Sequence, residues 1–267
     1  MGRVLIGMSQ SSRQSNLLED YHLLSYDVLD STNEEAKRLA GGGASHGAVI
    51  WAKRQTAGKG RMGREWESPE GNLYVSILLQ PPCSLAECSQ LSFVTAMAAV
   101  ETIKPIIADD GLVQAKWPND ILHNGKKLGG VLLESFTTPM EHDQDPLQWV
   151  VIGLGLNIDA HPAEARFPAT SLRESGVEII SAKIVLSRFI YNFIHAYDTW
   201  ASEGFEPVRK AWHDIAYRLG HPTDVLMGDQ LYQGAFQGID ELGRLLLQQS
   251  DGKLKAITAG DVLFKEG

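Results

Sequence analysis

The spacing of apolar residues along the chain predicts a series of strands in its first two thirds. Apolar or alternating runs fit strands at residues 48–55 and 72–81, and further strand candidates lie at 113–120, 127–136 and 148–158. A polar segment joins the last two candidates and suits a hairpin-type connection. The strand ending at residue 55 leads directly into a glycine-rich loop.

Apolar residues recur at helical spacing in four segments. In the first, residues 30–42, Ser31 and Glu34 have the spacing of a capping box, and Gly41 is a stop signal. The others carry one apolar face each and span residues 86–103, 183–200 and about 205–219, the last followed by Gly220. Because the strands are mostly consecutive and the helices are set apart, we expect an α+β fold, a mixed or antiparallel sheet with helices packed on one side.

The pattern changes near Pro222. From there, short apolar runs alternate with Gly-Asp, Leu-Gly and Asp-Gly turns, which is typical of a small β-barrel domain. The first twenty residues are rich in Ser and Gln. We therefore expect a loose N-terminal tail at 1–22, a main domain at 23–220 and a small C-terminal barrel domain at 221–267.

Composition narrows the class of protein. The 267 residues are 43% hydrophobic, which is enough for a sizeable core, and the net charge of −9 argues against binding bulk nucleic acid or an anionic membrane. No apolar run approaches the ~18 residues that a spanning helix needs. Cys83 and Cys88 fit a zinc half-site, a disulfide or two thiols, and no second pair or nearby His completes a zinc ligand set. We expect a reduced, cytoplasmic protein.

The glycines of GKGRMG, residues 58–63, match two known phosphate-binding patterns, and the context excludes both. A dinucleotide-binding unit needs a helix after the third glycine, but Pro69 and Gly71 interrupt the segment and a strand follows. A protein kinase needs Val where Glu65 stands, and the chain has no His-Arg-Asp or Asp-Phe-Gly.

Charge makes this loop a candidate for another kind of phosphate site. Lys59, Arg61 and Arg64 alternate with the glycines, so the loop offers backbone N–H donors together with positive charge to a polyphosphate. A solvated basic hairpin tip is the alternative. Lys127, which lies close to a Gly-Gly pair, is a second candidate, and the alternative is a surface lysine at the start of a strand. Asn157 is a third candidate, and it is either a strand-end amide or a ligand contact.

Taken together, the short motifs of the chain resemble those of the biotin protein ligases. The loop GKGRMGREW at 58–66 corresponds to the family's GRGRxGRxW. The others, in chain order, are STN at 31–33, KWPND at 116–120, KLGG at 127–130 and IGLGLN at 152–157. Each motif alone is unspecific, but their co-occurrence is specific, and the resemblance extends over about residues 23–267.

The resemblance implies a catalytic domain like that of the class II synthetases, followed by an SH3-like β-barrel. It implies an ATP-dependent reaction with Mg²⁺ on the phosphates. Biotin's carboxylate attacks the α-phosphate of ATP, giving biotinyl-5′-AMP and pyrophosphate, and a lysine of a biotin carboxyl carrier domain then attacks the adenylate. The expected partners are biotin, ATP and the carrier domain, with no DNA and no membrane, and the expected state is a monomer or a homodimer.

The resemblance also assigns roles to the motif residues. The expected catalytic residues are Lys127, Asp120 and Arg61. Asp120 either orients or deprotonates the acceptor lysine or helps to hold Mg²⁺, which is otherwise bound mainly by ATP. Expected biotin contacts are Ser31, Thr32, Asn33, Gln55, Gly58, Lys59, Gly60, Arg61, Trp66, Lys127, Gly129 and Gly130. Expected ATP contacts are Lys59, Arg61, Arg64, Trp66, Asn119, Lys127 and Asn157. The structural alternatives are a helix cap for Ser31 and a core aromatic for Trp66.

The chain departs from the family pattern in two ways. Lys59 stands where the family has arginine, so the charge is kept but the planar fork is lost, and we expect biotinyl-AMP to be held less tightly. About 22 residues precede the first ligase-like strand, too few for a helix-turn-helix module, so we expect no DNA-binding repressor function.

Other functions remain as alternatives. The nearest is a lipoate or octanoate ligase of the same superfamily, against which the glycine and cation loop and the terminal barrel both argue. A non-catalytic biotin or adenylate sensor is another, although Lys127 and the loop cations, whose loss would indicate it, are present. A nucleic-acid-binding repressor is the weakest.

Overall fold

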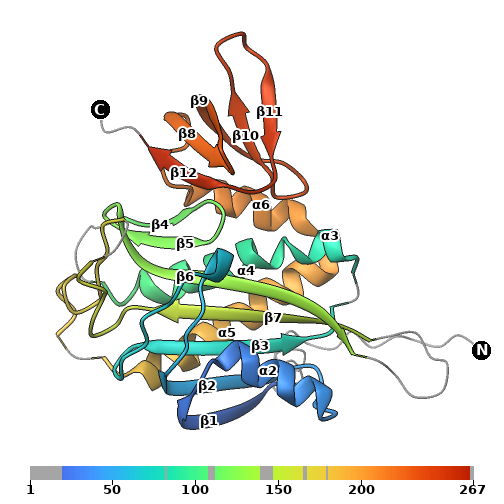
Figure 1. The fold of residues 1–267 in the computed structure, drawn as a ribbon, viewed down its shortest axis with the longest axis vertical. Helices are drawn as coiled ribbons and strands as arrows, with labels where there is room; N and C mark the ends of the chain where they lie inside the picture. Colours follow the sequence, from blue (N-terminus) through green and yellow to red (C-terminus); the bar gives the residue numbers. More distant parts are fainter. Residues whose placement is uncertain are drawn as a thin grey trace, which may run out of the picture.

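The computed structural model describes residues 20–81, 83–107, 112–138, 147–164, 167–178 and 180–264. Two sheets organise this part of the chain (Figure 1). Residues 1–19 of the predicted tail at 1–22 lie outside the described residues. Residues 139–146, which are most of the predicted hairpin connection, also lie outside them. No helix in the described part is both long enough and apolar enough to cross a membrane.

The larger sheet has seven strands in the order β1-β2-β3-β7-β6-β5-β4. Only β1 and β2 run parallel and every other neighbouring pair is antiparallel, so the predicted mixed sheet is confirmed. The strands are β1 (His22–Leu29), β2 (Ala48–Gln55), β3 (Leu73–Leu79), β4 (Val113–Lys116), β5 (Asp120–His123), β6 (Lys126–Thr138) and β7 (Leu147–Leu156). The single strand expected at 113–120 is wrong: a turn containing Pro118, which has no N–H to give to a ladder, separates β4 from β5.

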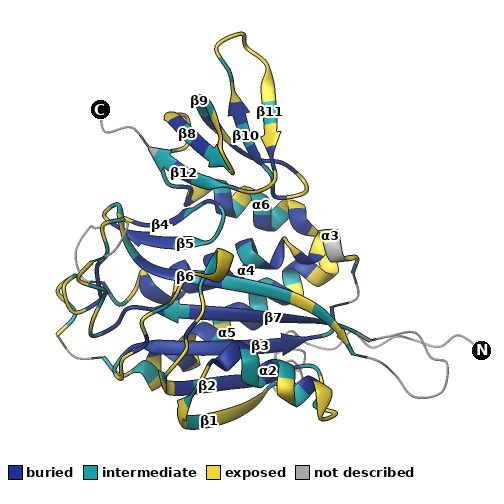
Figure 2. Cartoon of the chain, in the orientation of Figure 1, coloured by how far each residue is buried: buried dark blue, intermediate teal, exposed yellow. Residues whose placement is uncertain are grey.

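Alternate residues of the central strands enter two separate apolar clusters, one on each face of the sheet. Ile77 and Val150 pack in the larger cluster with the helices α4 (Leu91–Ile103) and α5 (Ala182–Glu203). Leu78 and Val151 pack instead with Ala36 of α2 (Thr32–Gly41). The helices therefore do not all lie on one side, and that expectation is wrong. Figure 1 shows α2 in front of the sheet and α4 and α5 behind it, and Figure 2 shows that β3 and β7 between them are buried.

The helices begin and end close to their predicted positions, with two differences. They are α2 (Thr32–Gly41), α3 (Leu85–Cys88), α4 (Leu91–Ile103), α5 (Ala182–Glu203) and α6 (Phe205–Asp214). The predicted helix at 86–103 is divided into α3 and α4. The helix expected to reach residue 219 ends at Asp214, because the Ile215 carbonyl and the Tyr217 N–H both bond to Ala115 of β4.

The C-terminal residues form a second sheet of five strands in the order β11-β10-β9-β8-β12, all antiparallel. They are β8 (Pro222–Met227), β9 (Gln230–Ile239), β10 (Leu245–Gln248), β11 (Leu254–Ile257) and β12 (Asp261–Phe264). No pairing joins the edge strands β11 and β12 in the described residues, so the closed SH3-like barrel stays a prediction. Trp212 of α6 packs between Phe93 and Phe236 and so connects this sheet to the main body.

Candidate active site

A cavity of about 420 Å³ opens on the face of the large sheet that carries α2. The segment between β2 and β3 crosses this face and forms one wall of the cavity, and its short 3₁₀ turn, η1 (Arg61–Gly63), lies there (Figure 1). The other walls are the start of α2, the strands β5, β6 and β7, and the beginning of β12. The cavity therefore lies where both sheets meet the glycine-rich loop.

Most of the residues selected from the sequence share this cavity. Those that line it are Ser31, Thr32, Asn33, Gln55, Lys59, Gly60, Arg61, Arg64, Trp66, Asn119, Asp120, Lys127, Gly130 and Asn157. Gly58 and Gly129 do not line it. A Cβ at Gly58 would lie 2.4 Å from the Trp66 carbonyl oxygen, and one at Gly129 would lie 2.3 Å from Leu156 Cδ2, so both glycines permit close packing of the cavity walls.

One end of the cavity is lined by buried amide and hydroxyl groups. Gln55 Oε1 accepts from the N–H of Thr32 at 2.8 Å and lies 3.1 Å from its hydroxyl. The Ser76 hydroxyl donates to Asn33 Oδ1 at 2.6 Å. Ser31 is only 2% exposed and its hydroxyl makes no cap bond, so the predicted capping box is wrong. These groups form a polar end in which a ligand with several donors and acceptors can be recognised.

The glycine-rich loop folds back on itself as a small hairpin. The Gly60 N–H donates to the Arg64 carbonyl at 2.7 Å, and the Trp66 N–H donates to the Gly58 carbonyl at 2.9 Å. Gly63 at the tip has a φ of +72°, a conformation that glycine adopts without strain. This hairpin carries its basic side chains and Trp66 to the cavity.

The indole of Trp66 packs directly on the backbone of β7. A Cβ at Gly155 would lie 2.6 Å from the indole ring, so only glycine fits there. The indole Nε1 is buried, and it has no hydrogen-bond partner in the described part of the protein. Trp66 therefore forms an apolar wall of the cavity, which makes it more than a core aromatic.

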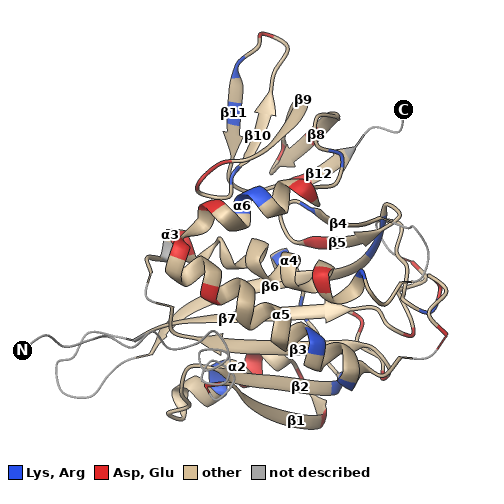
Figure 3. Cartoon of the chain, turned by 180° about the vertical axis from the view of Figure 1, so that it is seen from behind, with Lys and Arg blue, Asp and Glu red and all other residues tan. Residues whose placement is uncertain are grey.

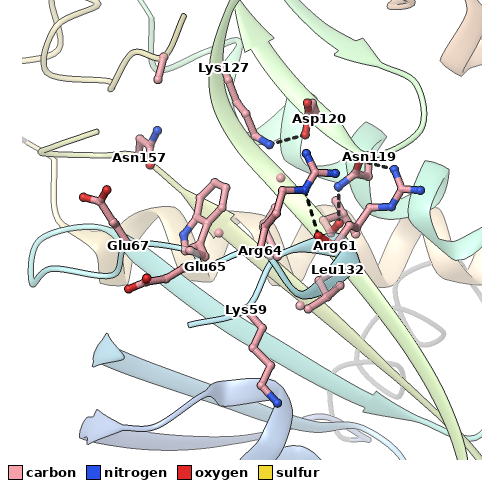
Figure 4. A pocket seen from close by; sticks show the side chains of 18 of the residues that line it. Lys59, Arg61, Arg64, Glu65, Glu67, Asn119, Asp120, Lys127, Leu132 and Asn157 are labelled. Atoms are coloured by element: carbon pink, nitrogen blue, oxygen red, sulfur yellow. Dashed lines mark hydrogen bonds and ion pairs between the residues drawn. The ribbon is translucent and has the colours of Figure 1, made fainter. Parts of the chain in front are cut away.

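Three cationic side chains gather beyond this wall, and Figure 4 shows them together. Lys127 Nζ lies 2.6 Å from Asp120 Oδ1, and Arg61 donates to Asn119 Oδ1 at 3.2 Å. Arg64 forms an ion pair with Asp261 of β12 at 3.1 Å. Burial lowers the pKa of the Arg61 guanidinium, while the Asp120 carboxylate acts in the opposite direction. A bound anion would relieve part of this desolvation cost.

Lys59 lies apart from the other cations. Its Nζ is 2.9 Å from Glu34 Oε1 on α2, and in Figure 4 the side chain extends away from the group around Lys127. Hydrogen bonds from Lys59 and Lys37 hold the pKa of Glu34 below its usual range. In this structure the Lys59 side chain therefore contacts α2, and its ATP and biotin contacts stay predictions.

Asn157 uses its side chain to hold a neighbouring segment. Its Nδ2 donates to the Thr170 carbonyl at 3.0 Å, and the Lys127 N–H donates to the Pro168 carbonyl at 2.7 Å. These bonds bring Phe167 to the rim, where its ring lies 4.5 Å from Lys116 Nζ. Asn157 therefore acts on the cavity in part by fastening its rim.

Several lining residues were not selected from the sequence. Lys116 lies within the KWPND motif, so a signal was present, but Phe167 lies in a segment without periodicity. Asp261 is 197 residues from its partner Arg64, and no local pattern joins them. Among the described residues, no cluster of three or more His, Cys, Asp or Glu side chains could hold a metal ion.

Chemically, the cavity suits a ligand with a polar head, an apolar middle and an anionic end. Hydroxyls and amides line one end, Trp66 and Gly130 line the middle, and Lys127, Arg61 and Arg64 stand at the other end. Charge elsewhere is of mixed sign: Figure 3 shows both signs interspersed over the face that carries α3 to α6, with no continuous basic stripe in the coloured part of the chain.

Comparison with known sequences agrees with this geometry. The profile of the Biotin/lipoate A/B protein ligase family matches residues 25–157, and that of the Biotin protein ligase C terminal domain matches residues 219–265. A biotin–[acetyl-CoA-carboxylase] ligase of Paracoccus denitrificans is 35% identical over 240 residues, which are 88% of this chain and 97% of that protein. A bifunctional ligase/repressor BirA of Bacillus subtilis is 35% identical over 90% of this chain and 73% of its own length.

Solved structures show the same fold. The biotin protein ligase of Aquifex aeolicus in complex with biotin and ATP superimposes with a TM-score of 0.77 at 28% sequence identity. The match covers 92% of this chain and 99% of the other.

Proposed function

Since the chain belongs to the biotin protein ligase family, we propose that its cavity activates biotin with ATP and passes the biotinyl group to a lysine of a carrier domain. It is an ATP-dependent biotin–[acetyl-CoA-carboxylase] ligase. The carrier is the biotin carboxyl carrier domain of a carboxylase.

The order of chemical groups along the cavity carries this proposal. Biotin has a ureido ring, an apolar valeryl chain and a carboxylate, in that order. Thr32 and Gln55 are suited to the ring, Trp66 lies where the valeryl chain would run, and Lys127 and Arg61 stand at the carboxylate end. The buried polar groups at this end of the cavity need hydrogen-bond partners, so an acid without matching donors and acceptors binds less well. Biotin therefore fits better than lipoate.

In the first step, a carboxylate oxygen of biotin attacks the α-phosphorus of ATP. The bond from that phosphorus to the bridging oxygen breaks, and pyrophosphate leaves with the electron pair. Nucleophile, phosphate and leaving group are all anionic, so fixed cations lower the barrier most. Lys127 and Arg61 supply that charge at the reacting phosphate, and Arg64 supplies it to the leaving phosphates. Asn119 and Asn157 contact the nucleotide.

The cavity suits Mg²⁺ that arrives with the nucleotide. Its lining carboxylates are dispersed, and no cluster of three ligands is found in the described residues, so the phosphates of ATP would supply most of the oxygen ligands. Asp120 is the side chain best situated to add one. When bound, the ion neutralises charge on the phosphates.

In the second step, the ε-amine of the carrier lysine attacks the carbonyl carbon of biotinyl-AMP, and AMP leaves. Before this, the mixed anhydride must be protected from water, and the glycine-rich loop covers it. Asp120 then either accepts a proton from the incoming amine or orients the amine for attack. The same proposal includes a cytoplasmic location, an SH3-like C-terminal domain from about residue 221 and a monomeric or homodimeric state. It does not include DNA-binding repression.

ATP–pyrophosphate exchange tests the proposal. It is measured with biotin, with lipoate and without acid, on the wild type, on Lys127→Ala and on the control Lys126→Ala, whose side chain is exposed and pairs with Glu174 outside the cavity. We expect exchange with biotin only, a loss of about 10²- to 10³-fold in Lys127→Ala, and no loss in the control. Exchange with lipoate would assign the chain to the lipoate ligases, and no exchange with either acid would contradict a catalytic role.

A further inference from the structure

A chain of ion pairs and hydrogen bonds runs from the glycine-rich loop to the polar end of the cavity. Lys59 Nζ and Lys37 Nζ both lie 2.9 Å from Glu34 Oε1. Lys37 Nζ is also 2.7 Å from Glu134 Oε1, and the other oxygen of Glu134 accepts from Asn33 Nδ2 at 2.8 Å. The loop and the first turn of α2 are thus joined through charged side chains.

The chain of contacts continues through the polar end and returns to the loop. The Ser76 hydroxyl lies 2.6 Å from Asn33 Oδ1 and 2.7 Å from Thr32 Oγ1. The amide of Gln55 then joins Thr32 to the Ser68 hydroxyl, which donates to the main chain of the loop. The contacts therefore form a ring that begins on one arm of the loop and ends on the other, with the start of α2 in between.

The Lys59 contact differs from the other side-chain attachments of the loop. Arg61 and Arg64 contact Asn119 and Asp261, but both guanidiniums also belong to the cation group that faces the ligand. They must share or exchange these partners when phosphates bind. The ammonium of Lys59 faces away from that group, so its contact with Glu34 can persist when the cavity is filled.

We propose that Glu34 is a positioning residue that fastens the glycine-rich loop, through Lys59, to the helix carrying the ring-binding residues. This proposal rests on the proposed function for its consequence, which is retention of biotinyl-AMP. The pair is partly exposed, Lys59 by 49% and Glu34 by 28%, so its effect is expected to be modest. Loss of the pair should let the loop open about two- to fivefold more often, which corresponds to ~0.4–1 kcal/mol and lies within the range measured for exposed pairs.

The matched pair of variants is Glu34→Gln and Glu35→Gln. Both residues lie in the first turn of α2, but Glu35 bonds to Arg38 and Tyr26, away from the loop. The first measurement is tryptic cleavage after Arg61 and Arg64 in the ligand-free protein, followed by mass spectrometry. This readout does not depend on any catalytic activity of the protein itself. We expect cleavage two- to fivefold faster in Glu34→Gln, unchanged cleavage in Glu35→Gln, and equal melting temperatures for both.

A double-mutant cycle separates positioning from a general loss of structure. Lys59→Gln alone, Glu34→Gln alone and both together should all cleave at the same raised rate, because each removes the Lys59–Glu34 contact. Glu34→Gln also removes the pair with Lys37, but that pair lies within α2 and does not reach the loop. Additive effects, or wild-type protection in Glu34→Gln, would overturn the proposal.

The second measurement is the half-life of enzyme-bound biotinyl-AMP in the same variants. We expect it to shorten two- to fivefold in Glu34→Gln and to be unchanged in Glu35→Gln. A loosened loop with an unchanged half-life would overturn the positioning role. The proposed function fails separately, through absence of biotin-dependent pyrophosphate exchange in the wild type, in which case cleavage still decides whether Glu34 fastens the loop.

Discussion

The ammonium nitrogen of Lys127 lies 2.6 Å from Oδ1 of Asp120, and a β-bulge brings the two side chains together. Asp120 pairs with Gly130 across β5 and β6, but Lys127 pairs with Leu122, because one extra residue of β6, Leu128, interrupts the register. In a regular ladder, side chains three residues apart point to opposite faces. The bulge turns Lys127 to the face of Gly130 and Asp120, which is the face of the cavity.

Replacement of Asp120 by Asn should impair adenylation. The amide keeps the size but loses the charge that holds Lys127 in place, and hydrogen bonds to charged groups are worth about 1.5–3 kcal/mol. We therefore expect biotin-dependent pyrophosphate exchange to fall at least about tenfold. Transfer from separately prepared biotinyl-AMP is the second measurement. Normal exchange with slow transfer would contradict positioning of Lys127 and would assign Asp120 to the acceptor lysine.

This bulge illustrates what sequence could and could not predict about the site. The strands around Lys127 and Asp120 follow from apolar runs and turn residues, and the motifs identify both side chains as candidates. Their mutual orientation depends on a single inserted residue in a ladder, which apolar spacing does not reveal. In the same way, the sequence identified the loop cations, but only three-dimensional packing shows that Lys59 turns to Glu34 and Arg64 to Asp261.

The fold was predictable to a similar degree. Strong periodicity identified α5 and most strands of the large sheet, because those elements have buried faces. The face on which α2 lies could not be read from its own sequence, since it depends on which alternate residues of β2 and β3 are covered. Helix α6 ends early because of pairing with β4, about 100 residues away, which competes with local helix propensity.

Gly155→Ala should displace the Trp66 wall. The new Cβ would lie 2.6 Å from the indole. Strand β7 is hydrogen-bonded between β3 and β6, so it cannot move to accommodate the new atom. We expect a loss of about 1–3 kcal/mol in the free energy of unfolding, typical of overpacking, together with a raised KM for biotin. The control is Gly41→Ala, where the described residues, apart from the chain neighbours and backbone of the same helix, place no heavy atom within 4 Å of the new Cβ. Equal stability of the two variants in urea denaturation would contradict this packing.

Lys59→Arg should retain biotinyl-AMP longer than the wild type. A guanidinium can form two parallel bonds with the Glu34 carboxylate, whereas an ammonium acts as a point charge. We expect the half-life of the bound adenylate to rise several-fold, measured by release into excess unlabelled biotin and ATP. The control is Lys53→Arg, because Lys53 forms an exposed ion pair with Asp27. Comparable half-lives in the wild type and Lys59→Arg would contradict the prediction.

His213 should make the packing of α6 on the C-terminal sheet sensitive to acid. Its Nε2 accepts from the Ile239 N–H at 2.9 Å, which requires a ring unprotonated at that nitrogen. Burial lowers the pKa of His213 below the ordinary value of about 6.5, and the charge of the nearby Arg209 lowers it further. As the pH falls from about 6.5 toward the folded pKa, the unfolded chain takes up a proton that the folded chain does not. The free energy of unfolding should therefore decrease over that window and be constant, for this group, above it.

The measurement is urea unfolding between pH 8 and pH 5 for the wild type and for His213→Gln, whose amide oxygen can accept from Ile239 without titrating. The other seven histidines are common to both proteins, so their contribution cancels in the difference. We expect the wild type to lose more stability than the variant below pH 6.5 and an equal amount above it. Parallel curves over the whole range would mean that His213 is protonated equally in both states, and that its contact with Ile239 does not contribute to joining α6 to the second sheet.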